Sequence, residues 1–160
     1  MSLYVIGVVY LHEEFKNTDE ILLQIKILSS RIYFDRIDED DIDTICLEAQ
    51  SAAPTFKGLK FIALRLSDSE SDYSATSLWN DSRERPSGER INNQPSELEE
   101  IIHALTGCKY ILGGAIGLFD GSIDSVFKGS AVNCSRYLSR LFSEQWDNME
   151  NPLIIWSKET

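Results

Sequence analysis

The chain opens with an apolar run that has the length and the residue types of a buried strand. Leu3 to Leu11 is β-branched and aromatic, and the polar pair Glu13 and Glu14 follows it. Such residues favour a pleated, buried environment, and the run lacks the basic start and the cleavage site of a signal peptide. We therefore expect a buried, central strand at this position.

Further strand and helix signals alternate along the rest of the chain. Thr18 to Arg31 has both a helical repeat and a strand-like alternation, and its capping threonine and acidic first turn favour the helix. The other predicted helices are Asp40–Ser51, Ser96–Gly107 and Ala131–Trp146; the other predicted strands are Leu59–Leu66, Lys109–Phe119 and Leu153–Trp156. In Lys109–Phe119 the glycines favour a bulge or close backbone packing over a nucleotide loop, because no helix begins directly after them.

A long polar segment separates the two halves of the chain. Residues 67–96 are rich in Ser, Asn and Asp, and loops of this length are uncommon in compact domains. Tyr73 to Trp79 could pair as a hairpin with Leu59–Leu66. Tyr73 and Trp79 are also the aromatic types that anchor interfaces, although packing of Trp79 onto the core explains them equally well.

These elements predict an α+β fold in a single domain spanning residues 1–160. We expect a mixed sheet of about five strands packed against three to four helices, because strands and helices do not alternate strictly enough for a doubly wound sheet.

The net charge indicates which kinds of partner the protein can bind, and the cysteines indicate the compartment in which we expect it. Asp and Glu number 26 against 15 Lys and Arg, which gives a net charge of −11. Such a surface repels phosphate backbones and anionic lipids, so we expect neither direct nucleic-acid binding nor a membrane role. The 3 cysteines are far apart and match neither a disulfide framework nor a zinc motif, which favours a reduced, cytoplasmic compartment.

The densest acidic patch runs from Asp35 to Asp43, and it has more than one interpretation. It lacks the glycine and the bidentate glutamate of an EF-hand, so calcium binding of that type is disfavoured. Carboxylates at a helix start are stabilised by the macrodipole, which is sufficient to explain the run. The same carboxylates could instead steer a basic partner, and the overall charge points the same way.

No catalytic set is visible in the sequence, and no cofactor is implied. His12 could act as a general base beside Glu13, but nothing in the sequence places a second catalytic group beside it. His103 is typical of a partly exposed helix residue, and Cys134 lies on an apolar helical face, where a buried structural thiol is the default.

We therefore expect a non-catalytic acidic protein that binds or inhibits a basic partner. Bacterial immunity proteins, which neutralise a nuclease-type toxin by occluding its active site, have this general character, but no motif ties the chain to a family. The alternatives are a small enzyme with a carboxylate metal site and an acidic nucleic-acid mimic that blocks a DNA-binding protein. A monomer and a homodimer both remain open. The predicted partner-binding residues are Asp38, Asp40, Asp41, Asp43, Glu13, Glu14, Tyr73 and Trp79.

Overall fold

The computed structural model describes residues 4–13, 18–28, 32–66, 97–119, 123, 125–142 and 152–158. They form one mixed sheet of six strands in the order β2-β3-β1-β4-β6-β5. The strands are β1 (Tyr4–Leu11), β2 (Ile32–Tyr33), β3 (Phe61–Leu66), β4 (Ile111–Phe119), β5 (Ser125–Ser130) and β6 (Pro152–Ser157). The helices are α1 (Thr18–Leu28), α2 (Glu39–Ala52), the 3-10 helix η1 (Pro54–Phe56), α4 (Glu97–Thr106) and α5 (Ala131–Phe142).

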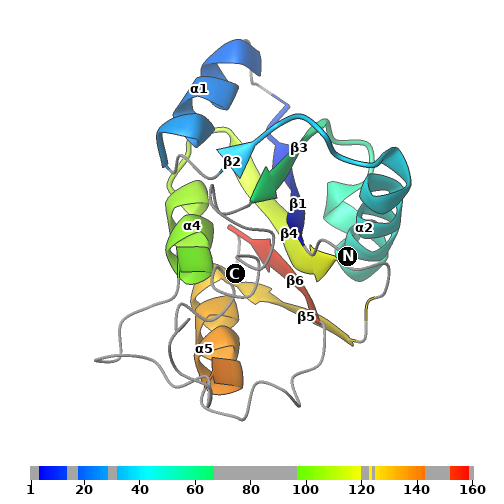
Figure 1. The fold of residues 1–160 in the computed structure, drawn as a ribbon, viewed down its shortest axis with the longest axis vertical. Helices are drawn as coiled ribbons and strands as arrows, with labels where there is room; N and C mark the ends of the chain where they lie inside the picture. Colours follow the sequence, from blue (N-terminus) through cyan, green and yellow to red (C-terminus); the bar gives the residue numbers. More distant parts are fainter. Residues whose placement is uncertain are drawn as a thin grey trace.

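The sheet is covered on both faces (Figure 1). Helices α1, α4 and α5 pack on one face, over a core that includes Ile25, Leu105 and Cys134. Helix α2 and η1 pack on the other face, over a second core that includes Tyr10 and Ala49. The sheet therefore separates two hydrophobic cores, which explains why its central strands are apolar on both sides.

Strand β1 is central, as the sequence predicts. It pairs antiparallel with β3 on one side and with β4 on the other, and its residues from Ile6 to Leu11 are buried. The β1–β4 register shifts between Tyr10 and Leu11, beside the glycines of β4. A Cβ atom on Gly114 would lie 2.3 Å from the Val8 carbonyl oxygen and 2.9 Å from the Trp156 ring. The expected bulge and the expected close packing at the β4 glycines are thus both confirmed.

The two edge strands, β2 and β5, were missed by the sequence analysis. β2 has only two residues, and β5 alternates between half-buried and exposed positions without a strong apolar signal. β5 runs parallel to β6, and helix α5 connects them as a crossover. The six described strands are therefore four of the expected ones together with β2 and β5, and the remaining expected strand, Tyr73–Trp79, lies outside the described residues.

The α+β class and the remaining described elements are confirmed. Thr18–Leu28 is a helix and not a strand, and the observed bounds of α2 and α4 differ from the predicted ones by a residue at each end. The predicted strand Tyr73–Trp79, the rest of 67–96, and the predicted continuation of α5 through 143–146 lie outside the described residues.

Candidate functional site: an acidic helix face and a surface pocket

The acidic run forms the start of helix α2. Asp38 has extended backbone angles and caps the helix, because its Oδ1 accepts a hydrogen bond of 2.8 Å from the backbone N–H of Asp40. Glu39, Asp40 and Asp41 occupy the first turn, where carboxylates interact favourably with the helix dipole. Part of the run therefore has a structural role in starting the helix.

Helix α2 presents two different faces. Ile45, Cys46 and Ala49 are buried against the sheet. Asp40, Asp43 and Leu47 follow one another at three- and four-residue spacing on the opposite side, and all three are exposed. The Leu47 side chain is 72% exposed although the helix has an apolar face available for burial. The outer face of α2 (Asp40, Asp43 and Leu47) thus combines carboxylates with an uncovered apolar side chain.

Asp35 belongs to a different group of side chains. Its backbone carbonyl accepts a hydrogen bond from Arg65 Nε at 3.3 Å, and its carboxylate lies 3.8 Å from the same guanidinium. Arg65 and Lys26 both lie over the ring of Tyr33, at 4.7 and 4.3 Å from its centroid. Because Asp35 is paired within the protein, it is less available to an external cation than the carboxylates on the outer face of α2.

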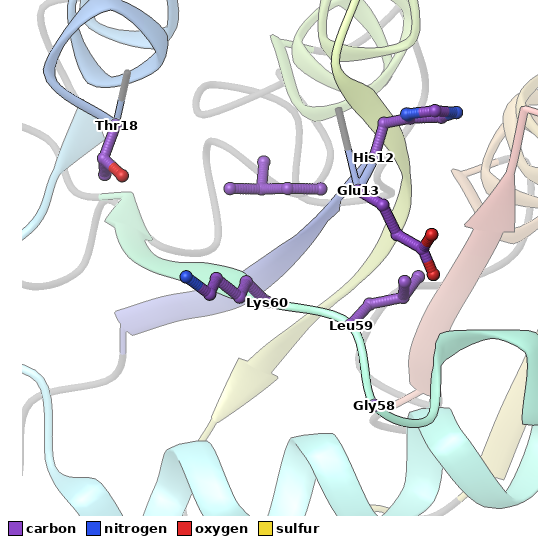
Figure 2. Close-up of a pocket in the computed structure, with 7 residues that line it drawn as sticks. His12, Glu13, Thr18, Gly58, Leu59 and Lys60 are labelled. Carbon is purple, nitrogen blue, oxygen red and sulfur yellow. The ribbon is translucent and has the colours of Figure 1, made fainter. Parts of the chain in front are cut away.

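His12 and Glu13 follow directly after β1 and line a surface pocket together with Thr18 and Lys60 (Figure 2). The pocket has a volume of about 430 Å³ and is lined by Leu11, His12, Glu13, Thr18, Gly58, Leu59 and Lys60. Backbone bonds hold its walls together: Leu11 N–H donates to the Lys60 carbonyl at 2.9 Å, and His12 N–H donates to the Tyr110 carbonyl at 2.7 Å. In Figure 2 the Lys60 ammonium and the Thr18 hydroxyl lie on one side, and the His12 ring and Glu13 carboxylate lie on the other.

The acidic run and Glu13 lie toward opposite ends of α2. Asp35, near the start of the helix, bonds to Arg65, which is paired with Ile6 near the start of β1. Gln50, near the end of the helix, donates a 3.4 Å hydrogen bond to Tyr10 near the end of β1. Because α2 has 14 residues, its ends are roughly 20 Å apart at the usual rise per residue. The structure therefore groups four predicted residues at the start of α2, which are Asp38, Asp40, Asp41 and Asp43. It places Glu13 toward the opposite end of this helix. The predicted residues Glu14, Tyr73 and Trp79 lie outside the described residues.

The described cysteines are free thiols, and two are buried. Cys134 is fully buried and its Sγ lies 3.5 Å from the Ile155 carbonyl oxygen. Burial raises the pKa of the Cys134 thiol to about 12, and burial also raises the pKa of Cys46. A thiol kept neutral and enclosed is a poor nucleophile, so Cys134 has the structural role that its helical position predicts.

Sequence analysis missed Leu47 and Phe61 as candidate binding residues. Leu47 could have been found, because it falls outside the apolar stripe of its helix when the residues are placed at helical spacing. Phe61 lies beside Tyr10, with ring centroids 5.9 Å apart, and its side chain is 41% exposed. No local signal marks Phe61, since an aromatic residue at the start of a strand is equally typical of a buried position.

Among the described residues, no group of three or more His, Cys, Asp and Glu side chains is arranged to hold a metal ion. None of the described helices combines the length and the apolar character needed to cross a bilayer.

The fold and these surfaces define an α+β protein with a six-stranded mixed sheet covered on both faces. Comparisons with protein-family models, with curated proteins and with solved structures found no match to this chain.

Proposed function

We propose that this chain is a non-catalytic binding protein whose outer α2 face docks on a basic protein. The observation that carries the proposal is Leu47, which is 72% exposed on the same side as Asp40 and Asp43 of a helix whose other face is buried. An exposed apolar side chain with charged residues around it is the arrangement of an interface anchor with a polar rim.

The charges on this face supply the attraction. Asp40 and Asp43 are exposed, and the chain carries a net charge of −11. Like charges on one helix repel one another, and Lys or Arg side chains of a partner would relieve this repulsion. Complementary charge of this kind raises association rates and loses its effect as the salt concentration increases.

The interface must extend beyond α2. The outer face of a 14-residue helix is roughly 20 Å long and 10 Å wide, or about 200 Å², whereas a stable interface covers about 800 Å² on each partner. Phe61 contacts Tyr10 on the α2 side of the sheet and is the nearby exposed aromatic residue. We therefore include Phe61 in the proposed surface, together with the outer face of α2.

The mode of action that fits this surface is occlusion. Asp40 and Asp43 would pair with basic residues at the substrate cleft of the partner, and Leu47 would fill an adjacent apolar depression. A bacterial immunity-type protein that neutralises a basic toxin or nuclease would act in this way. An acidic nucleic-acid mimic would use the same carboxylates and would differ only in its target, so identifying the partner distinguishes the two.

The test is affinity capture from the native source at low and high salt, followed by measurement of the dissociation constant for the retained protein. We expect a basic partner whose retention decreases as salt increases. Leu47→Ala should weaken binding by at least about tenfold, the usual effect of truncating an interface anchor.

The chain offers matched controls on the opposite face of the sheet. Leu23 on α1 is 63% exposed, so Leu23→Ala makes the same chemical change at a similar exposure. The pair Asp40→Asn and Asp43→Asn raises the net charge by the same amount as the pair Asp19→Asn and Glu20→Gln in the first turn of α1. If the α1 variants weaken binding as much as the α2 variants, the proposed surface is wrong even though a partner exists.

A further inference from the structure

A second cavity lies on the opposite face of the sheet from α2, where helix α5 packs on the edge strand β5. It has a volume of about 370 Å³ and is lined by Phe127, Asn133, Arg136 and Tyr137. Phe127 and Tyr137 pack against the core beneath α1, α4 and α5, whereas α2 covers the other core. This cavity, which we call the aromatic pocket, is therefore separate from the proposed partner-binding surface.

The walls of the aromatic pocket are fixed by close packing between β5 and α5. The rings of Phe127 and Tyr137 are stacked, with centroids 4.1 Å apart and planes 8° from parallel. A Cβ atom on Gly129 would lie 2.9 Å from the Asn133 Cβ, so glycine is what allows the helix to approach the strand this closely. Ser130 Oγ accepts a 3.2 Å hydrogen bond from the Asn133 N–H and fixes the start of the helix.

Two of the polar side chains at the pocket, those of Arg136 and Asn133, can donate hydrogen bonds to a ligand. Asn133, Arg136 and Tyr137 lie on one side of α5 because they are three and four residues apart. Among the described residues, neither the Arg136 guanidinium nor the Asn133 side-chain amide has a hydrogen-bond or ion-pair partner, and both residues are exposed. None of the described residues that line the cavity carries a carboxylate, although Asp and Glu outnumber Lys and Arg by 26 to 15 in the whole chain.

This combination of groups has a definite ligand preference. A guanidinium presents a planar fork of donors that matches the two oxygens of a carboxylate, and a side-chain amide can donate a further hydrogen bond. Because the Phe127 and Tyr137 rings already cover one face of each other, the outer face and the edges of the pair are what they offer to another planar group. The volume falls near the lower end of the range for small-molecule sites, which suits one small ring system with an acidic substituent.

We propose that the aromatic pocket binds a small planar aromatic acid. The ring of the ligand packs on Phe127 and Tyr137, and its carboxylate accepts hydrogen bonds from Arg136, with Asn133 as an additional donor. This binding is independent of the proposed protein partner and requires no covalent step.

The test is an NMR titration of the isotopically labelled protein with 2-naphthoate, in which the amide chemical shifts of β5 and α5 are measured at each ligand concentration. We expect saturable shifts centred on Gly129 and Asn133. Comparison ligands separate the two parts of the recognition: 2-naphthol keeps the ring without the carboxylate, and cyclohexanecarboxylate keeps the acid without the planar ring. Each should bind at least about tenfold more weakly than 2-naphthoate, and 2-naphthyl phosphate tests whether the acid can be a phosphate.

Variants then assign the site. Arg136→Gln removes an exposed charge and should weaken 2-naphthoate binding by at least about tenfold, while Lys57→Gln makes the same charge change at an exposed residue next to η1 and should leave it unchanged. Tyr137→Leu should also weaken binding, and its folding can be checked by the dispersion of the amide spectrum. The proposal is overturned if 2-naphthoate gives no saturable shift up to about 10 mM, if 2-naphthol binds equally well, or if Arg136→Gln has no effect.

Discussion

Replacing Gly114 by alanine provides a direct test of the central sheet. The new Cβ atom would lie 2.3 Å from the Val8 carbonyl oxygen and 2.9 Å from the Trp156 ring, so it would enter the space between β1 and β6. An ordinary contact between such atoms needs about 1 Å more, because nonbonded carbon atoms are optimally separated by roughly 3.5 Å. Strand β1 or β6 would therefore have to move away from β4.

The expected loss of stability can be worked from this displacement. Overpacking a core position costs about 1–3 kcal/mol, and each ladder hydrogen bond that is stretched costs about a further 0.5–1.5 kcal/mol. With two ladder bonds affected, we expect Gly114→Ala to lower the free energy of unfolding by about 3 kcal/mol or more. Urea denaturation followed by circular dichroism and by tryptophan fluorescence measures this quantity.

Gly58→Ala is the matched control, because it makes the same change at an exposed turn. Gly58 has a φ of +80°, and a Cβ atom there would meet no atom within 4 Å. The cost is then limited to the left-handed backbone conformation, about 1–2 kcal/mol, and is reduced by the lower entropy of the unfolded chain. If Gly114→Ala costs no more than Gly58→Ala, the register that pairs Gly114 with Val9 and with Trp156 is wrong.

Other substitutions test the helix cap, the second core and the buried thiol by the same denaturation assay. Asp38→Ala removes the cap of α2 and should cost about 1 kcal/mol; an unchanged midpoint would contradict the 2.8 Å bond to Asp40. Phe56→Ala removes the ring that stacks on Tyr10 at 4.4 Å and should cost about 3–5 kcal/mol, whereas a small loss would place Phe56 outside the core. Because the Cys134 thiol titrates near pH 9 when unfolded and near pH 12 when buried, only the unfolded state loses its proton between these values, and stability falls as pH rises. Between about pH 8 and pH 10, the free energy of unfolding of the unsubstituted protein should fall by about 1.4 kcal/mol more than that of Cys134→Ala. Equal decreases in the two proteins would show that the buried thiol does not cause the pH dependence.

Local sequence signals were sufficient for the elements that carry their own pattern. The apolar run ending at Leu11 predicted β1 because a strand buried on both faces must be apolar at consecutive positions. The acidic start and the apolar stripe predicted α2, since capping and amphipathic spacing act within a few residues of one another. β5 could not be predicted from the sequence, because a half-exposed edge strand has no strong apolar pattern and is stabilised by pairing with its neighbour β6.

The grouping of functional residues could not be predicted in the same way. The sequence predicts one partner-binding surface for Glu13 and the acidic residues from Asp38 to Asp43, whereas the contacts of Asp35 and Gln50 place Glu13 and the acidic run toward opposite ends of α2. Helical spacing already places Leu47 outside the apolar stripe of its helix, and the position of the sheet then shows that Leu47 stays 72% exposed.

The charge of this protein, its α+β class and the positions of its strongest elements follow from the amino-acid sequence, because each depends on composition or on residues close together in the chain. Tertiary structure decided which apolar residues stay exposed and which polar groups share a surface. Those properties depend on the order of the strands and on which helix covers which face of the sheet. Burial at one position is set by residues far away in sequence: Gly114 lies between Val8 and Trp156, and Gly129 allows Asn133 to approach β5.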